Sequence, residues 1–283
     1  MLFLRSWRGK GEVGDAPMVA TLRRYRNAFL AFLRLSLAEE VAYRGHLFAN
    51  LLQSLFWFAW FLGMVRVYFL HTDRLGGWRY EEVLAVVGVF QIVNGAIQTV
   101  FQPNIGRLVE YVRLGTLDFW LTKPLDSQFT VSTRYFVVWR SVSVIAGLSL
   151  VIYAAWRLGV TVTPMRVLLF LLMLACALCI VYGIMLGVMT LCFWFVRLEN
   201  LIVLLWSFWE TGRYPVTVYR GIPRFLLTYL VPVAFVTTVP AEAVVGRLEG
   251  ATVGIALALA IGMLIGVRTL WQFALRHYSG ASS

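Results

Sequence analysis

Charged side chains are scarce in this sequence, and acidic ones are the scarcest. Only 14% of the 283 residues are charged, and the 14 Asp and Glu residues stand against 25 Lys and Arg. A soluble domain usually carries about 25% charged residues. The deficit is concentrated in apolar runs long enough to cross a bilayer, and the polar–apolar alternation of a membrane β-barrel is missing. The composition therefore predicts an all-α integral membrane protein with one transmembrane domain, residues 1–283.

Residues that bind metals or carry out catalysis are also few. The three cysteines, Cys176, Cys179 and Cys192, lie in one apolar run, and the C-x-x-C spacing of the first two has no partner pair and no nearby histidine. No Ser–His–Asp set or carboxylate pair supports catalysis. The nucleotide-binding pattern G-x-x-x-x-G-K-[ST] does not occur; "RGKGE" lacks both the upstream glycine and the following Ser or Thr. We therefore expect no enzyme activity, no metal and no cofactor.

Apolar runs fill most of the chain. Residues 1–19 read as a cytoplasmic tail, and residues 20–44 as an amphipathic helix at the membrane surface, with Leu22, Tyr25, Phe29 and Phe32 on one stripe. After it come six predicted spans, with approximate bounds 46–70, 82–101, 136–156, 167–196, 201–213 and 251–273.

The charge distribution predicts the orientation of these spans. Basic residues remain on the cytoplasmic side of a membrane, and they are abundant both before the first span and near the C-terminus. Both termini are then cytoplasmic, which requires an even number of crossings. Residues 214–247 are accordingly predicted to enter the membrane from the outer face and return, since proline breaks helices. The prolines of this outer re-entrant element are Pro215, Pro223, Pro232 and Pro240. No basic run alternates with exposed aromatics, so no nucleic-acid partner is expected.

One charged and punctuated segment, residues 104–134, separates two apolar runs on the predicted cytoplasmic side. "IGRLVEYVR" predicts a short helix in which Glu110 reaches Arg107 and Arg113, and Gly115 suits the left-handed residue that ends it. Thr116 is expected to cap a second short turn, and Asp126 or Ser127 to cap the helix entering the third span. The apolar set Leu117, Phe119, Trp120 and Leu121 is expected to be exposed. The segment is either a docking surface for a cytoplasmic partner or a loop resting in the lipid headgroups.

Two further features have both structural and functional interpretations. Glu210 and Arg213 lie one helical turn apart and form either an interfacial ion pair or part of a translocation path. The G-x-x-x-G pairs at 183 and 187 and at 262 and 266 favour close helix packing within the chain.

Three stretches together resemble the ABC-2-type permeases, the membrane subunits of ABC exporters, in particular the six-span branch that includes daunorubicin-type export permeases. They are "LRLSLAEEVAYRGHLFANLLQSLFWFAWFL", "GRLVEYVRLGTLDFWLTKPLDSQF" and "RYPVTVYRGIPRFLLTYLVPVAFVTTVPAEAV", and the likeness covers about residues 20–275. The resemblance implies a bacterial inner-membrane exporter subunit that moves a hydrophobic or amphipathic substrate.

The same resemblance implies partners and roles for particular residues. The permease would pair with a second copy or a sister permease and borrow energy from a separate ATP-binding subunit, which holds ATP and magnesium. Segment 104–134 would contain the coupling helix that meets this subunit, and "VRLEN" a smaller contact. The residues assigned to this coupling are Arg107, Glu110, Tyr111, Arg113, Gly115, Asp118, Arg197 and Glu199. The alternative is a membrane anchor or membrane enzyme subunit that docks another cytoplasmic partner.

Overall fold

The computed structural model describes residues 18–42, 44–195 and 199–278. In this part of the chain, five helices are long and apolar enough to cross a membrane, and a sixth crossing is possible if one bent helix pair is a single span. The protein is therefore an all-α integral membrane protein. The long helical stretches are α2 (Arg44–Tyr68), α3 to α4 (Tyr80–Arg113), the turn η2 with α7 (Val138–Arg157), α8 with η3 (Pro164–Phe193) and α12 (Gly250–Arg276). The predicted tail falls largely outside the described residues.

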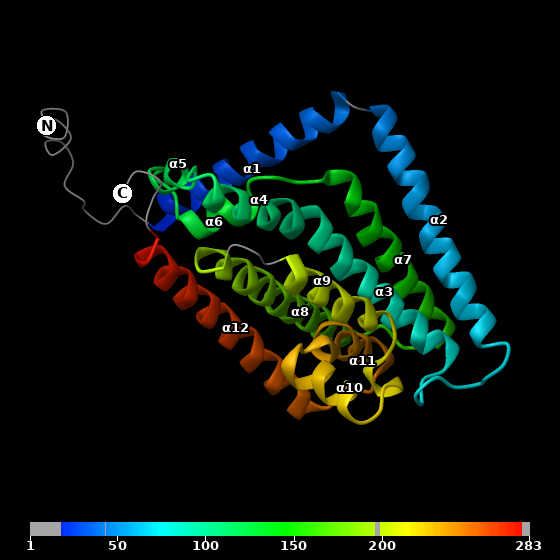
Figure 1. Ribbon diagram of the computed structural model, residues 1–283. Coiled ribbons are helices and arrows are strands. Elements are labelled where there is room, and N and C mark those ends of the chain that lie inside the picture. The colour runs from blue at the N-terminus through cyan, green and yellow to red at the C-terminus, as the bar shows by residue number, and fades with distance from the viewer. Residues whose placement is uncertain (1–17, 43, 196–198, 279–283) are drawn as a thin grey trace, which may run out of the picture.

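The bundle has two recognisable ends. The short helices α5 (Asp118–Leu121) and α6 (Ser127–Thr133) lie at one of them, which we call the α5 end. The short helices α10 (Ile222–Phe225) and α11 (Val239–Val245) lie at the other, the α10 end (Figure 1).

The second long stretch is continuous where the sequence predicted a break near residue 101. It runs for 34 residues, as α3 (Tyr80–Ala96), the π-helix η1 (Ile97–Phe101) and α4 (Gln102–Arg113). Pro103 removes one backbone donor near the start of α4, and the wider π-turn just before it continues into α4 as one helical stretch. Helix α4 is thus an extension of the span toward the α5 end, and not a separate helix.

The predicted fifth span, 201–213, is shorter than a membrane crossing. It forms α9 (Glu199–Glu210), 12 residues, and the 3-10 turn η4 (Thr211–Arg213), 3 residues. At the usual rise per residue this element is about 24 Å long, below the roughly 30 Å of a hydrocarbon core.

The proline-rich stretch after α9 is bent, as predicted for 214–247. The helical segments Ile222–Leu230 and Ala234–Val245 meet at 68°, and Pro232 lies in the break. Pro223 lies in the first turn of α10, where a missing N–H costs little, and Pro215 precedes the 3-10 turn η5 (Val216–Val218). The prediction that Pro240 breaks a helix was wrong, because the π-helix η7 (Ala234–Thr238) passes into α11 across it.

The core is built around α3, which is buried along almost its whole length between α7, α8 and α11. Its closest neighbour is α7. A side-chain carbon added to Gly147 would lie 2.5 Å from the carbonyl oxygen of Gly88, and one added to Gly95 would lie 2.7 Å from Val144. These glycines therefore set the distance between the two helices.

The G-x-x-x-G pairs contribute less to packing than predicted. Gly183 packs against Met263 in the contact between α8 and α12, but a side chain added to Gly187, Gly262 or Gly266 would meet open space. Spacing alone did not identify the glycines that bring helices together.

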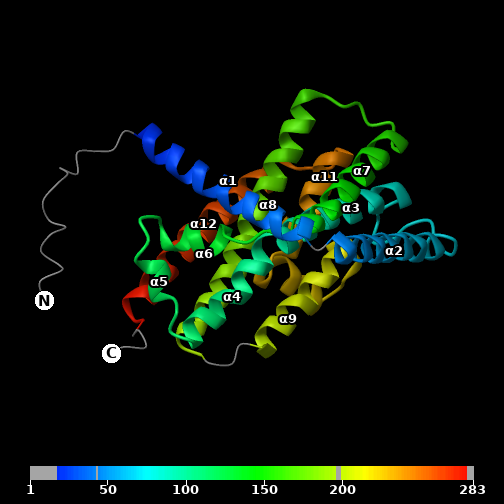
Figure 2. The ribbon, with the colours of Figure 1, turned by 90° about the horizontal axis from the view of Figure 1, so that it is seen from above.

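Helix α2 lies at the edge of the bundle in both views (Figures 1 and 2), next to α1 (Met18–Ala42) in sequence and at some distance from α7 in Figure 1. It contacts the other helices mainly near its C-terminal end, where Phe61 packs against Tyr214 and Arg66 lies over the Tyr80 ring. Only 6% of the residues in the apolar stretch of α2 are buried, and Phe56, Trp57 and Trp60 are each more than half exposed. This helix therefore leaves a large apolar surface without a partner in the monomer.

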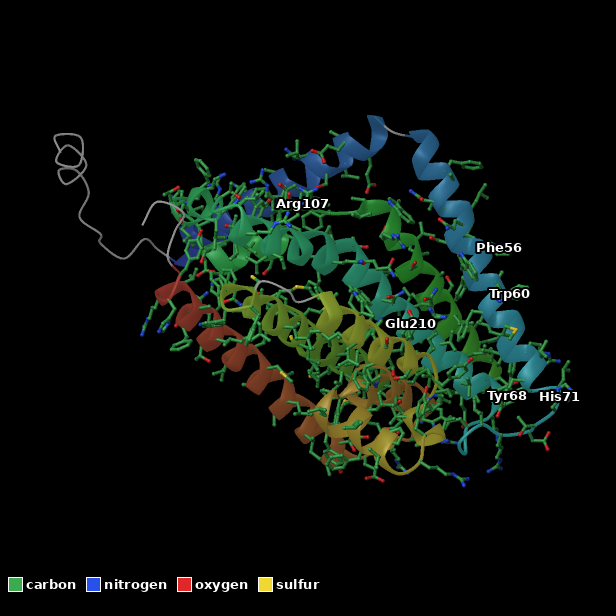
Figure 3. The ribbon with its side chains drawn as sticks, viewed as in Figure 1. Phe56, Trp60, Tyr68, His71, Arg107 and Glu210 are labelled. Atoms are coloured by element: carbon green, nitrogen blue, oxygen red, sulfur yellow. The ribbon has the colours of Figure 1, made fainter. Side chains whose placement is uncertain are left out.

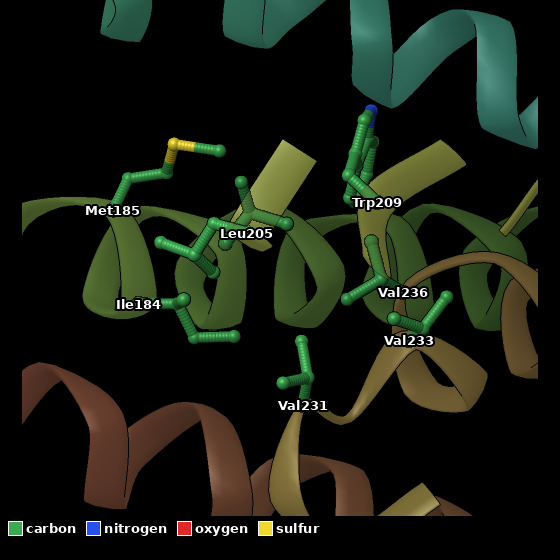
Figure 4. Close-up of a pocket in the computed structure, with 8 residues that line it drawn as sticks. Ile184, Met185, Leu205, Trp209, Val231, Val233 and Val236 are labelled. Atoms are coloured by element: carbon green, nitrogen blue, oxygen red, sulfur yellow. The ribbon is translucent and has the colours of Figure 1, made fainter. Parts of the chain in front are cut away.

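A small cavity lies between α8, α9 and the bent element (Figure 4). Its volume is about 20 Å³, and its lining is apolar, including Met185, Leu205, Trp209 and Val236. A space of this size and chemistry holds no polar partner for a ligand and is a packing defect of the core.

Candidate functional site

The end of α4 is fixed by Gly115, as predicted. Gly115 has φ +66°, and the N–H groups of Gly115 and Thr116 donate to the carbonyls of Val112 and Tyr111 at 3.2 and 3.0 Å. These two hydrogen bonds satisfy the last carbonyls of the helix, and they form because the glycine adopts the left-handed conformation. The predicted capping role of Thr116 was wrong, because Leu117 is the N-cap of α5 and makes no side-chain cap.

The aromatic residues of α5 are divided between the interior and the surface. Leu117 is fully buried and Trp120 is half-buried, so the prediction that both are exposed was wrong. Phe119, at 71% exposure, and Leu114, at 56%, form the apolar part of the surface instead. Asp118 begins α5 and is half-buried. The short helix is thus anchored on one side and presents an apolar surface on the other.

A cluster of cations and aromatic rings holds α4, α5 and the chain after α6 together. The guanidinium of Arg107 lies 3.5 Å from the centre of the Tyr135 ring, and that of Arg134 lies 3.8 Å from the Trp120 ring. The hydroxyls of Tyr111 and Tyr135 are 3.2 Å apart. Such cation–π contacts stabilise by about 0.5–1 kcal/mol each at exposed sites. Arg107 and Tyr111 therefore have a structural role that the sequence did not reveal.

The two remaining charges of α4 point outward. Glu110 and Arg113 are exposed, and neither takes part in an ion pair among the described residues. The expected pairing of Glu110 with Arg107 is not formed, because Arg107 stacks on Tyr135 instead. Glu110, Arg113, Leu114, Phe119 and Leu121 are all exposed on α4, on α5 and in the turn between them, and we call these five residues, of mixed charge and apolar character, the α4–α5 surface.

Helix α6 is capped by Asp126, as predicted, but it does not lead directly into the third span. The Asp126 carboxylate accepts from the Phe129 N–H at 3.1 Å, and the helix ends at Thr133, five residues before η2 (Val138–Arg140). The backbone between them is held by Asn104 of α4, whose side chain donates to the Tyr135 carbonyl at 2.7 Å and accepts from its N–H at 2.8 Å. The chain after α4, through α5 and α6, is therefore folded back against α4.

Asp126 also ties this segment to the last long helix. Arg268 of α12 donates to both carboxylate oxygens of Asp126, at 3.1 and 2.7 Å, and to Gln128 at 2.9 Å. Partial burial acts to raise the pKa of Asp126, but the bonds from Arg268 and from the Phe129 N–H outweigh it, so the pKa lies below its usual value. The buried Gln128 further bonds Tyr182 of α8 at 3.0 Å. Helix α6 is thus bonded to both α8 and α12.

We expect Asp126→Ala to lower the thermal midpoint of the purified protein more than Asp126→Asn. Alanine removes both the helix cap, about 1 kcal/mol, and a charge-assisted pair, about 1.5–3 kcal/mol. Asparagine keeps an oxygen for the cap and loses only the charge. Because the folded pKa is depressed, the pair stabilises above the unfolded pKa of Asp126, and this contribution disappears as the pH falls through that range to the folded value.

A double-mutant cycle with Arg268→Gln isolates the pair. The loss in the double variant should be clearly smaller than the sum of the two single losses. Additive losses would show that the two side chains do not interact.

The surface helix α1 is bonded to the same region. The Tyr25 hydroxyl accepts from the Asp126 N–H at 3.2 Å, and the Tyr25 and Phe29 rings pack edge-on against Phe129 and Phe136. Near the other end of α1, the Glu40 carboxylate accepts from the N–H groups of Val138 and Trp139.

The predicted apolar stripe of α1 therefore lies against protein at Tyr25 and Phe29, and the side chain of Leu22 is outside the described part. Burial raises the pKa of Glu40, although the two N–H donors act against it.

The second predicted contact, "VRLEN", is only partly described. Arg197 lies outside the described residues, and Glu199 is the first residue of α9, with no side-chain environment described. Their proposed role stays a prediction.

Glu210 and Arg213 form an ion pair, one of the two outcomes predicted for them. They also line a large cavity of about 670 Å³, which opens between α2 and the helices α3, α7 and α9. Figure 3 places Glu210 between Arg107, toward the α5 end, and Tyr68 and His71, at the opposite end. The pair therefore lines this cavity, with both side chains well exposed.

None of the three cysteines lies in segment 104–134 or lines the large cavity. Cys176 and Cys192 are buried and Cys179 is partly buried, all three are free, and no metal-binding group of His, Cys, Asp or Glu occurs among the described residues. We expect substitution of all three by alanine to leave transport nearly unchanged, because an apolar helix needs only their volume. Loss of transport together with release of a bound metal from the parent protein would contradict this.

The architecture is that of a polytopic membrane protein with a folded-back segment at one end and a bent, proline-rich element at the other. The family model described as "ABC-2 family transporter protein" matches residues 50–282. The chain belongs to the ABC-2 family and is a multi-pass membrane permease component of an ABC transporter. The comparisons with curated proteins and with solved structures found no match.

Proposed function

We propose that this permease is half of an ATP-driven exporter and resembles the daunorubicin-type branch of its family. It works with a second permease, either another copy or a sister chain, and moves a hydrophobic or amphipathic substrate out of a bacterial cell across the inner membrane. The main support is the α4–α5 surface, since an exposed patch of mixed charge and apolar side chains on a rigid, internally braced segment suits a protein partner.

The partner that fits this surface is the ATP-binding subunit that the family generally requires. The ABC-2 permeases are generally without an ATPase of their own, so the subunit that binds ATP and magnesium is separate. ATP binding would move the α4–α5 surface, and the Asp126–Arg268 pair and the bonds to Tyr182 would carry that movement into α12 and α8. The Pro-rich element at the α10 end would then open on the outer side.

Purification of the native complex in mild detergent tests this function. An ATP-binding-cassette subunit should co-purify in equal stoichiometry, and its ATP hydrolysis should require the permease. A permease that purifies with an unrelated cytoplasmic enzyme and no ATPase would instead support the anchor function.

We expect the α5 end to be cytoplasmic and the α10 end to face outward. In a cysteine-free background, Phe119→Cys should resist a membrane-impermeant maleimide applied to whole cells, whereas Ile222→Cys should react. Both side chains are well exposed, at 71% and 76%, so access depends on the side of the membrane. Reaction at position 119 in intact cells would overturn the orientation.

A further inference from the structure

The cavity of about 670 Å³ beside α2, which we call the α2 groove, has a size typical of small-molecule sites. The part of its lining that comes from α2 is mainly aromatic and includes Trp57, Trp60 and Phe61, although Gln53 and Ser54 also face the groove. The amides Gln91, Asn94 and Gln98 and the charged Arg140 come from α3, η1 and η2.

Asn94, Gln98 and Arg140 are joined by a chain of hydrogen bonds. Trp209 donates to the Asn94 side-chain oxygen at 3.2 Å, and Gln98 donates to the same oxygen at 3.1 Å. The Gln98 side-chain oxygen in turn accepts from the Arg140 guanidinium. Gln98 lies in the π-helix η1, a distortion often found at functional sites.

Arg140 is a cation without an anionic partner in the described residues. The three ion pairs found there use other arginines, namely Arg213, Arg247 and Arg268. The guanidinium lies 4.1 Å from the centre of the Trp139 ring and is partly buried. A charged group held inside a membrane protein without a counter-ion is costly, and such groups commonly serve a ligand.

The other residues of the groove indicate which charge and which apolar part a ligand would carry. Arg213 is neutralised by Glu210 and lies over the Phe61 and Phe90 rings, so Arg140 supplies the net positive charge. Trp57 and Trp60 are each 58% exposed. A ligand with an acidic group beside Arg140 and an apolar part against the α2 tryptophans would match both features of the groove.

We propose that the α2 groove binds an amphiphile whose acidic head group pairs with Arg140 and whose apolar tail lies against α2. If the chain exports as proposed above, this amphiphile defines the class of its cargo. The binding itself needs no ATP-binding subunit, so it is testable on the purified permease.

Tryptophan quenching by brominated lipid tests the site. The full-length protein in neutral detergent receives trace brominated phosphatidylglycerol or brominated phosphatidylcholine with the same chains. The acidic lipid should quench at a lower concentration, and this preference should shrink roughly tenfold in Arg140→Gln, since one charge-assisted contact is lost. Arg140→Lys should keep most of the preference, and replacing both Trp57 and Trp60 by phenylalanine should clearly reduce the quenching, with Trp139 left as the tryptophan that lines the groove.

Arg157→Gln is the matched control, because this arginine ends the same helix and is exposed. It should quench like the wild type. Equal quenching by both lipids, or an unchanged preference in Arg140→Gln, would overturn the proposal.

Two further measurements distinguish a bound acidic lipid from a free anion and from a second copy of the chain. Inorganic phosphate at millimolar concentration should not displace the lipid; full displacement would mean a free-anion site. Quenching that appears only after dimers dissociate would overturn the proposal and assign the groove to a second copy. If the acidic lipid does not bind the α2 groove but the permease still co-purifies with an active ATPase, the proposed lipid site is wrong and the export function is unaffected.

Discussion

Glu110→Lys should prevent the ATP-binding subunit from co-purifying with this permease, or abolish its substrate-stimulated ATP hydrolysis. Glu110 is exposed on α4 and uses its carboxylate in no ion pair among the described residues, so it is free to meet a basic group of a partner. Breaking a desolvated charge pair from one side costs about 2–5 kcal/mol, which weakens binding by roughly 30-fold or more. Two symmetric contacts in a dimer would multiply the loss.

The fold itself should survive this change. Glu110 lies in the last turn of α4, where a positive charge interacts favourably with the helix dipole, and it contributes no hydrogen bond to the Tyr135 cluster. An unchanged thermal midpoint would therefore show that lost coupling is not lost folding.

Glu39→Lys provides the matched control. Glu39 is an exposed acid on α1, on the side of the membrane predicted for Glu110 but away from the α4–α5 surface. If the segment only rests in lipid headgroups, both lysines should be neutral or mildly favourable beside anionic lipid. Wild-type co-purification and ATP hydrolysis in Glu110→Lys would refute the coupling assignment.

Local signals predicted some of the ends of elements, although the Thr116 cap and the break at Pro240 were wrong. The left-handed Gly115 and the Asp126 cap follow from rules that act over a few residues, and both are present. The bend at Pro232 follows from the missing backbone donor in the same way.

What the sequence did not predict depends on partners far away in the chain. Arg107 stacks on Tyr135 instead of pairing with Glu110, and Asp126 bonds Arg268, 142 residues later. Nor did it predict that Leu117 is buried, because a short amphipathic helix does not show which face a neighbour covers. The α2 groove was missed for the same reason: Gln98 and Arg140 come together only when two helices pack.

The glycines show the same limit, and Gly147→Leu should give the largest loss of folded protein of any single change considered. A side-chain carbon at this position would lie 2.5 Å from the Gly88 carbonyl oxygen and 2.8 Å from the Ile92 nitrogen. Both are backbone atoms inside a buried helix, so neither moves without separating α3 from α7. Overpacking usually costs about 1–3 kcal/mol when side chains can shift, and here they cannot, so we expect a larger cost.

The measurement is the yield of monodisperse protein after extraction, together with its thermal midpoint. Gly262→Leu is the control: it makes the same substitution in a long apolar helix, but an added side chain there meets open space. Gly147→Leu should lose most of the monodisperse protein and Gly262→Leu almost none, although only Gly262 belongs to a G-x-x-x-G pair. Equal yields would mean that α3 and α7 are not held as closely as Gly88 and Gly147 place them.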